Sequence, residues 1–356
     1  MSRLESLRIR LQEEGIDGIL ISTRENRRYL SGFTGSAGVL AIGLQEAFLV
    51  TDFRYWEQAA AESKDFEIFK QGPQLWASIG ELLQKLNWKR IGFEGGNLTF
   101  DEYQNLKKII AANSTLVPVT DLVEALRVVK DDIEIGLITK AAAITDLAWE
   151  KTVVRIIPGV IERDLALEFD YQLRLNGADG NAFPTIVASG KRAALPHAAP
   201  SNKGIKPGEF VLIDGGAVYQ GYHADLTRTV VLGKADPEQH RIYQLVLKAQ
   251  LEALNHLRAG LIGREVDSKA RNVISQAGYS DNFGHGLGHS VGLNIHEHPR
   301  LSPTESNLIP KGAVVTVEPG IYLPQWGGVR IEDLVVVEED GIRNLTGAPK
   351  EELLEV

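Results

Sequence analysis

The sequence predicts an α+β protein in which a smaller α/β domain precedes a larger domain built on a mostly antiparallel sheet. The chain has 356 residues, which is more than one ordinary domain. Helical and strand patterns alternate in its first part, whereas runs of strands mix with runs of helices in its second half. We place the boundary near residue 126, which gives domains of residues 1–126 and 127–356.

The elements of the first domain follow from the spacing of apolar residues. Leucines recur at helical spacing up to Leu11, and Gly15 predicts the end of this helix. Apolar runs predict strands at residues 19–21, 38–42 and 47–50, and a helical pattern covers residues 76–86. The glycine-rich turn at residues 32–38 lacks both the P-loop and the GxGxxG pattern, so we expect no nucleotide site there.

The second domain is expected to contain longer helices. A helical pattern from Leu122 to Ile138 is followed by a second one that ends at Pro158. Further helices are expected at residues 162–176, 237–257 and 265–277. Strands are expected at residues 210–213, 227–232, 314–317 and 329–337. Acidic residues lie inside or directly after several of these apolar strand patterns.

Composition and charge exclude several classes of function. The chain has no cysteine, so disulfides, thiolate metal sites and cysteine nucleophiles are excluded. A net charge of −9 argues against a nucleic-acid partner, which normally meets a basic face. The charged N-terminal helix is unlike a signal peptide, and no apolar run approaches the roughly 20 residues that span a bilayer. We therefore expect a cytoplasmic protein without a membrane partner.

Two aspartates mark a candidate metal site. Asp214 directly follows the apolar run of residues 210–213, and the glycines after it let the backbone turn. Asp225 comes eleven positions later, and a hairpin between the two would turn both carboxylates toward one pocket. The alternative is that each aspartate only caps the end of a strand.

Two glutamates in strand patterns point to the same site. Alternation places Thr316 and Glu318 on one face of their strand, and it places Arg330 and Glu332 on a common face of theirs. Burying an unpaired carboxylate is very costly, so such acids need partners. A salt-bridge network is the alternative, but four carboxylates outnumber the obvious cations. Divalent metal balances their charge better.

A glycine-rich loop adds imidazoles to these acids. Four of the eight histidines lie between His285 and His298, where alternating glycines disfavour a helix. An oxygen-rich ligand set with one imidazole suits Mn, Co, Zn or Fe(II). Two such ions roughly 3.5–4 Å apart hold a bridging hydroxide, which is the chemistry of a hydrolase. No GxSxG motif supports a serine hydrolase instead.

These segments also resemble the Xaa-Pro peptidases of the pita-bread metallopeptidase family, which includes prolidases and aminopeptidase P. The similar segments are DGGAVYQGYHADLTRT, HGLGHSVGLNIHEHP, TVEPGIY and GGVRIED, in the order expected for the family. The resemblance covers nearly the whole chain. It implies a C-terminal pita-bread fold with an antiparallel sheet and flanking helices, preceded by a creatinase-type α/β domain. It also implies a homodimer.

The resemblance implies a role for each metal ligand. Asp214 would bind one metal ion, and His289 and Glu318 would bind the other. Asp225 and Glu332 would bridge the two ions. Glu318 would also act in catalysis as the proton shuttle for the bridging hydroxide. The two divalent ions per chain are expected to be Mn, with Co or Zn as alternatives.

The resemblance also implies four further active-site residues. His197 would steady the substrate and the tetrahedral intermediate, His285 and His296 would be the other active-site histidines, and Arg330 would contact the substrate. An Xaa-Pro bond is a tertiary amide without an N–H group, so the site must supply a proton to its leaving nitrogen. Each of the three histidines is a candidate for this step, because imidazole titrates near neutrality.

The expected activity is hydrolysis of the Xaa-Pro bond at the N-terminus of proline-containing peptides, by attack of the metal-bridging hydroxide. Residues 33–38 and 52–55 look more like the aminopeptidase branch of the family than like an Xaa-Pro dipeptidase restricted to dipeptides. A dipeptidase needs a cation for the proline carboxylate, and Arg330 is a candidate for it. A metal-free creatinase-like hydrolase and a catalytically inactive binding protein are further alternatives, which the complete ligand set disfavours.

Overall fold

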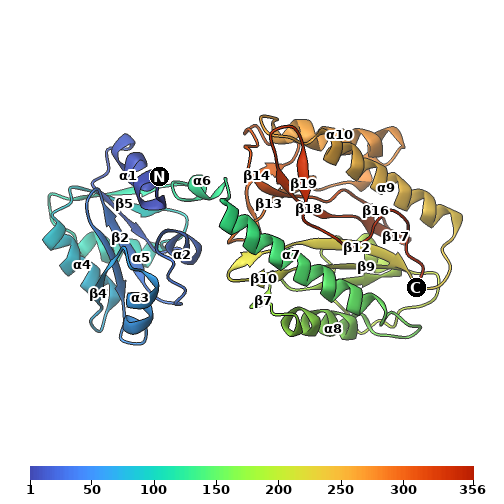
Figure 1. Cartoon of the computed structure of the whole chain (residues 1–356), viewed down its shortest axis with the longest axis horizontal. Coiled ribbons are helices and arrows are strands. Elements are labelled where there is room, and N and C mark those ends of the chain that lie inside the picture. The colour runs from blue at the N-terminus through green and yellow to red at the C-terminus, as the bar shows by residue number, and fades with distance from the viewer. The chain divides into compact units, whose positions relative to one another are not determined.

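The computed structural model describes residues 1–356, which divide into two compact units, residues 1–127 and 128–356. The division falls one residue after the boundary expected from the sequence. None of the helices is both long and apolar enough to cross a membrane. The two units share no sheet (Figure 1). Each has its own hydrophobic core.

The first unit contains one six-stranded mixed sheet with strand order β4-β3-β2-β1-β5-β6. Its strands are β1 (Gly18–Ile21), β2 (Val39–Gly43), β3 (Ala47–Thr51), β4 (Glu67–Lys70), β5 (Arg90–Glu94) and β6 (Thr115–Val119). Its helices are α1 (Arg3–Glu13), α2 (Arg24–Ser31), α3 (Trp56–Glu62), α4 (Leu75–Leu86), α5 (Phe100–Ile109) and α6 (Glu124–Arg127). Every residue of β1 and β2 is buried, as expected for central strands of an α/β sheet. The predicted α/β domain is confirmed.

The second unit has antiparallel strands only. They are β7 (Gly180–Asn181), β8 (Ile186–Ser189), β9 (Phe210–Gly215), β10 (Ala217–Tyr219), β11 (Tyr222–His223), β12 (Leu226–Val231), β13 (Gly288–Ser290), β14 (Glu297–Leu301), β15 (Val314–Val317), β16 (Gly320–Leu323), β17 (Gly327–Arg330), β18 (Asp333–Val337) and β19 (Ile342–Asn344). They form the sheets β7-β10-β11, β8-β9-β12 and β14-β13-β15-β18-β19, and the hairpin β16-β17.

Helices cover these sheets on two sides (Figure 1). They are α7 (Asp132–Val153), α8 (Glu162–Leu175), α9 (Pro237–His256) and α10 (Gly263–Gln276), and short 3₁₀ helices lie at Gly190–Ala194 and Ser280–Asn282. Helices α7 and α8 pack against β8, β10 and β11, whereas α9 and α10 pack against β14 to β17. The predicted mostly antiparallel α+β domain is confirmed.

Two predictions for the elements after residue 122 are wrong in detail. The patterns before Pro158 form the short α6 and one long helix, α7, rather than two long helices. The break lies at Asp131, whose side chain accepts a hydrogen bond from the Glu134 amide and so starts a new helix. The strand expected over residues 329–337 is split into β17 and β18, because β17 pairs with β16 and β18 pairs with β15. Glu332 lies where the chain crosses from one sheet to the other.

Candidate metal centre

Three carboxylates converge from three parts of the second unit. Asp214 lies on β9, Asp225 directly precedes β12, and Glu332 lies between β17 and β18. Their ligand oxygens all lie within 4.8 Å of one another, and all three side chains are buried. The hairpin of β10 and β11 joins the two aspartates, as their spacing predicted. Gly216 permits this approach, because a Cβ atom there would lie 1.8 Å from the Ala224 carbonyl oxygen.

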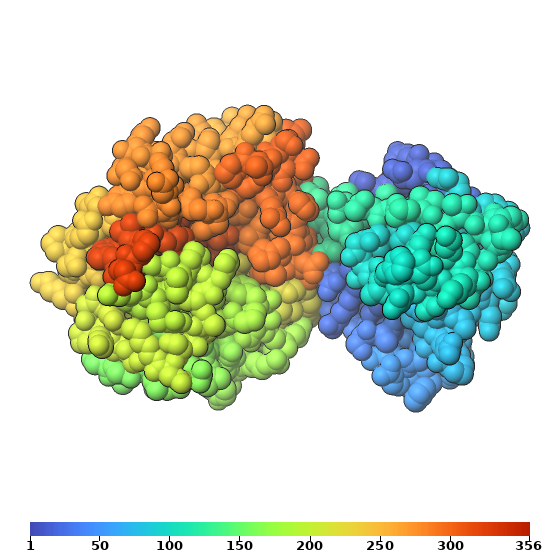
Figure 2. Space-filling view, turned by 180° about the vertical axis from the view of Figure 1, so that it is seen from behind, coloured from blue at the N-terminus to red at the C-terminus, as the bar shows by residue number.

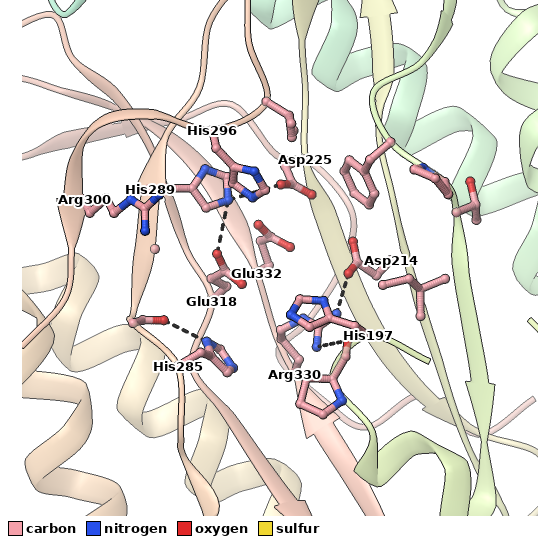
Figure 3. Close-up of a pocket in the computed structure, with 18 of the residues that line it drawn as sticks. His197, Asp214, Asp225, His285, His289, His296, Arg300, Glu318, Arg330 and Glu332 are labelled. Atoms are coloured by element: carbon pink, nitrogen blue, oxygen red, sulfur yellow. Dashed lines mark hydrogen bonds and ion pairs between the residues drawn. The ribbon is translucent and has the colours of Figure 1, made fainter. Parts of the chain in front are cut away.

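His289 and Glu318 complete the cluster from the neighbouring sheet (Figure 3). His289 Nε2 lies 3.4 Å from Glu318 Oε1 and 3.6 Å from Asp225 Oδ2. Thr316 connects His289 with Glu318. Its hydroxyl accepts a hydrogen bond from the His289 amide at 3.0 Å and donates one to Glu318 Oε1 at 3.1 Å. The structure therefore brings together all five residues that the sequence singles out as ligands.

The protonation of this cluster is strongly perturbed. Burial, followed by repulsion from Glu332, Asp214 and Glu318, raises the pKa of Asp225 well above its ordinary value. Burial raises the pKa of Glu318 to about 7, although Arg330 opposes this. Without a cation, the cluster therefore retains protons near neutral pH.

The imidazole of His289 is neutral in the same setting. Burial, with His296 nearby, lowers the pKa of His289 to about 3. A metal ion binds the neutral form of imidazole. His289 can therefore act as a ligand without first releasing a proton.

The donor set fits divalent metal ions. Asp225 Oδ1 and Glu332 Oε1 are buried acceptors without any hydrogen-bond partner. Buried carboxylate oxygens without partners are very costly. Arg330 neutralises only part of the charge: it pairs with Asp214 and donates to Thr227 Oγ1 at 3.0 Å. Carboxylate oxygens with one imidazole suit hard to borderline divalent ions.

The cluster opens into a cavity of about 630 Å³. In the space-filling view, the yellow-green surface of residues near 180–200 and the orange surface of residues near 285–300 face each other across a recess (Figure 2). The cavity is lined by all nine sequence-predicted site residues: His197, Asp214, Asp225, His285, His289, His296, Glu318, Arg330 and Glu332.

The three further histidines differ in their surroundings. His197 is exposed, and its imidazole makes no hydrogen bond within the chain. His296 packs edge-on against His289, with ring centroids 4.3 Å apart. His285 is held on both ring nitrogens: Nδ1 lies 2.8 Å from the Gly286 carbonyl oxygen and Nε2 lies 2.9 Å from the Tyr322 hydroxyl. Burial lowers its pKa to about 4.

Several residues of this site were not predicted from the sequence. Thr227 bonds Glu332 Oε2 at 2.6 Å, Tyr322 accepts from Arg330 at 2.8 Å, and Arg300 lines the cavity. Thr227 lies two positions after Asp225, and residues two apart in a strand face the same side. This spacing could have identified Thr227 from the sequence. Nothing in the local sequence distinguishes Arg300 from an ordinary surface arginine.

Known proteins share this organisation over the whole chain. Residues 136–339 match metallopeptidase family M24, and residues 3–129 match the creatinase/prolidase N-terminal domain. An Xaa-Pro dipeptidase of Pyrococcus horikoshii is 38% identical over 96% of this chain and 95% of its own length.

Solved structures show the same likeness. An Xaa-Pro dipeptidase from Bacillus anthracis has a TM-score of 0.96 and 42% identity over 99% of both chains. An X-Pro aminopeptidase from Thermotoga maritima has a TM-score of 0.90 and 38% identity over 96% of this chain and 99% of its own. The predicted resemblance to Xaa-Pro peptidases and the predicted pita-bread fold are confirmed. The chain is a metallopeptidase and belongs to family M24.

Proposed function

We propose that the protein is a metal-dependent Xaa-Pro dipeptidase, the alternative to the aminopeptidase that residues 33–38 and 52–55 resemble. One observation carries this choice: the cavity contains a free cation, Arg300. The names of two of the three relatives described above, from Pyrococcus horikoshii and Bacillus anthracis, support the same choice. The Thermotoga maritima neighbour, an aminopeptidase, defines the competing function.

The two arginines of the cavity have different tasks. Arg330 is only 3% exposed, and Asp214, Thr227 and Tyr322 occupy its guanidinium. It is therefore unable to receive a substrate carboxylate without losing these contacts. Arg300 is exposed, and its guanidinium makes no hydrogen bond or ion pair within the chain. It can pair with the free carboxylate of a dipeptide, which a longer peptide lacks at that position.

We further propose that the five clustered residues hold two divalent ions. Asp214, Asp225, His289, Glu318 and Glu332 would be the ligands, with Mn as the expected metal and Co or Zn as alternatives. When bound, such ions lower the pKa of water and polarise the scissile carbonyl. Glu318, which lines the cavity, would accept and return a proton during the reaction, as the family resemblance implies.

Hydrogen bonding argues against His285 as the donor of the proton for the leaving nitrogen. The Gly286 carbonyl can only accept, so His285 Nδ1 carries the proton of the neutral ring and Nε2 accepts from Tyr322. His285 then has no proton to give to a substrate. His197 and His296, whose rings border the cavity, remain the candidate donors.

The test compares an Ala-Pro dipeptide, its C-terminal amide and an Ala-Pro-Ala tripeptide as substrates of Mn-loaded protein. Loss of a charge-assisted contact costs about 1.5–3 kcal/mol, so kcat/KM should fall roughly 10- to 100-fold for the amide and the tripeptide. Equal cleavage of dipeptide and tripeptide would show an aminopeptidase.

The homodimer expected from the resemblance remains a prediction, which light scattering of the purified protein would check.

A further inference from the structure

One buried carboxylate holds both ends of the loop that carries His197. Glu162, the first residue of α8, is 0% exposed. Its Oε1 accepts from the amide and the hydroxyl of Ser189, each at 2.8 Å. Its Oε2 accepts from the amide and the hydroxyl of Ser201, at 3.1 and 2.6 Å, and from Arg192 Nε at 2.9 Å. Residues 189–201, here called the His197 loop, are thus closed on a single side chain.

The position of the His197 ring depends on this loop backbone. The imidazole makes no hydrogen bond within the chain, and the residue is exposed, so its own contacts do not fix it. Arg192 closes the loop further by donating to the Ala199 carbonyl. Burial alone would raise the pKa of Glu162, but hydrogen bonds from Ser201 and Ser189 outweigh it and hold the pKa below its usual value. The carboxylate therefore stays ionised and keeps all five donors.

We propose that Glu162 is a positioning residue that places His197 over the substrate. Glu162 does not line the cavity, so it acts only through the loop. The inference rests on the proposed function, because it takes His197 to act on a bound peptide. Displacement of an active-site group by about 1 Å can lower turnover up to 100-fold. Loss of the Glu162 carboxylate would free five donors at the base of the loop, so His197 would shift and turnover would fall. A purely structural role would instead lower the stability of the unit without depending on His197.

The experiment is a double-mutant cycle on the Ala-Pro dipeptide with metal-loaded protein. Glu162→Gln keeps the shape but turns an amide NH₂ toward hydrogen-bond donors, so kcat should fall about 10-fold while KM changes less than about 2-fold. In a His197→Ala background the same change should lower kcat less than about 2-fold. Glu168→Gln is the control on the same helix: Glu168 accepts from Gln172 at 2.9 Å and bonds no residue of the His197 loop, so this change should leave turnover unchanged.

An equal loss of kcat in both backgrounds would overturn the proposal. If Glu162→Gln does not fold, Ser201→Ala removes one donor and keeps the charge, and it should show the same dependence on His197 with a smaller loss. A second readout needs no activity: histidine ring signals in ¹H–¹³C NMR spectra of zinc-loaded protein. The signal that disappears in His197→Ala should shift or broaden in Glu162→Gln, whereas the His240 signal should not.

The two readouts separate this inference from the proposed function. If the wild-type protein cleaves neither the dipeptide nor the tripeptide, the proposed function fails, and the NMR comparison still decides the role of Glu162. An unmoved His197 signal would then overturn the inference.

Discussion

His289 and Glu318 come from the two sides of one strand pairing, and the Thr316 hydroxyl bonds both of them. It accepts from the His289 amide at 3.0 Å and donates to Glu318 Oε1 at 3.1 Å, while Nε2 and Oε1 lie 3.4 Å apart. Gly288 makes this approach possible, because a Cβ atom there would lie 2.0 Å from the Thr316 carbonyl oxygen. A single hydroxyl therefore orients two of the proposed ligands.

Thr316→Val should weaken metal binding without unfolding the protein. Loss of a group that orients ligands typically costs about 10- to 100-fold in metal affinity, and calorimetric titration of metal-free protein with Mn would measure it. Thr316→Ser keeps the hydroxyl and should bind metal about as tightly as the wild type. Equal weakening in both variants would show that the hydroxyl alone does not account for the orientation of the ligands.

Asp225→Asn should abolish both metal binding and turnover. Asp225 Oδ1 is a buried acceptor without a partner, and Oδ2 lies 3.6 Å from His289 Nε2, so this carboxylate borders most of the cluster. Metal analysis of the purified variant and a dipeptide assay would check the prediction. Asp146→Asn, which changes a carboxylate bonded to the backbone at Gly347 and Ala348, serves as the control and should retain metal. Full activity of Asp225→Asn would refute the two-metal site.

In metal-free protein, the contribution of Glu318 to stability should fall as the pH rises from about 4.5 to about 7. Burial raises the pKa of Glu318 from 4.5 to about 7, so the unfolded chain releases this proton before the folded chain does. The contribution to the free energy of unfolding is therefore fully present below pH 4.5 and is lost as the pH passes 7.

Glu318→Gln isolates this contribution, because glutamine has no proton to lose. The melting temperature of the metal-free variant relative to metal-free wild type should rise by a few degrees between pH 5 and pH 7, as measured by differential scanning calorimetry. The comparison cancels the histidines, which both proteins share. A constant difference across this range would show that Glu318 is already ionised in the folded protein.

Arg300→Ala should lower kcat/KM for an Ala-Pro dipeptide by roughly 10- to 100-fold, because the substrate carboxylate loses its cation. The C-terminal amide of the same dipeptide has no carboxylate, so its slower cleavage should hardly change. Arg300→Lys keeps the positive charge but lacks the paired N–H donors of a guanidinium. Its kcat/KM for the dipeptide should lie between the values for the wild type and Arg300→Ala. An equal loss for both substrates would place Arg300 outside carboxylate recognition.

Much of the fold could be predicted because its signals are local. Helix α9 begins at Pro237 after the capping residue Asp236, and both features can be read from neighbouring residues. The end of β17 could not be predicted in this way. The strand pattern continues through 329–337, and only pairing with two different partners, β16 and β15, divides it. Glu332 occupies the crossing that results.

The sequence by itself determined the candidate ligands, because carboxylates within apolar strand patterns require partners wherever those strands are buried. Only the tertiary structure decided how the charges are shared. Arg330, the cation expected to meet the substrate, is paired with Asp214, which lies 116 positions away in the chain. Arg300 is left free in the cavity instead. Ion pairing depends on distances between segments that folding alone brings together, so local patterns identify the charged groups but not their partners.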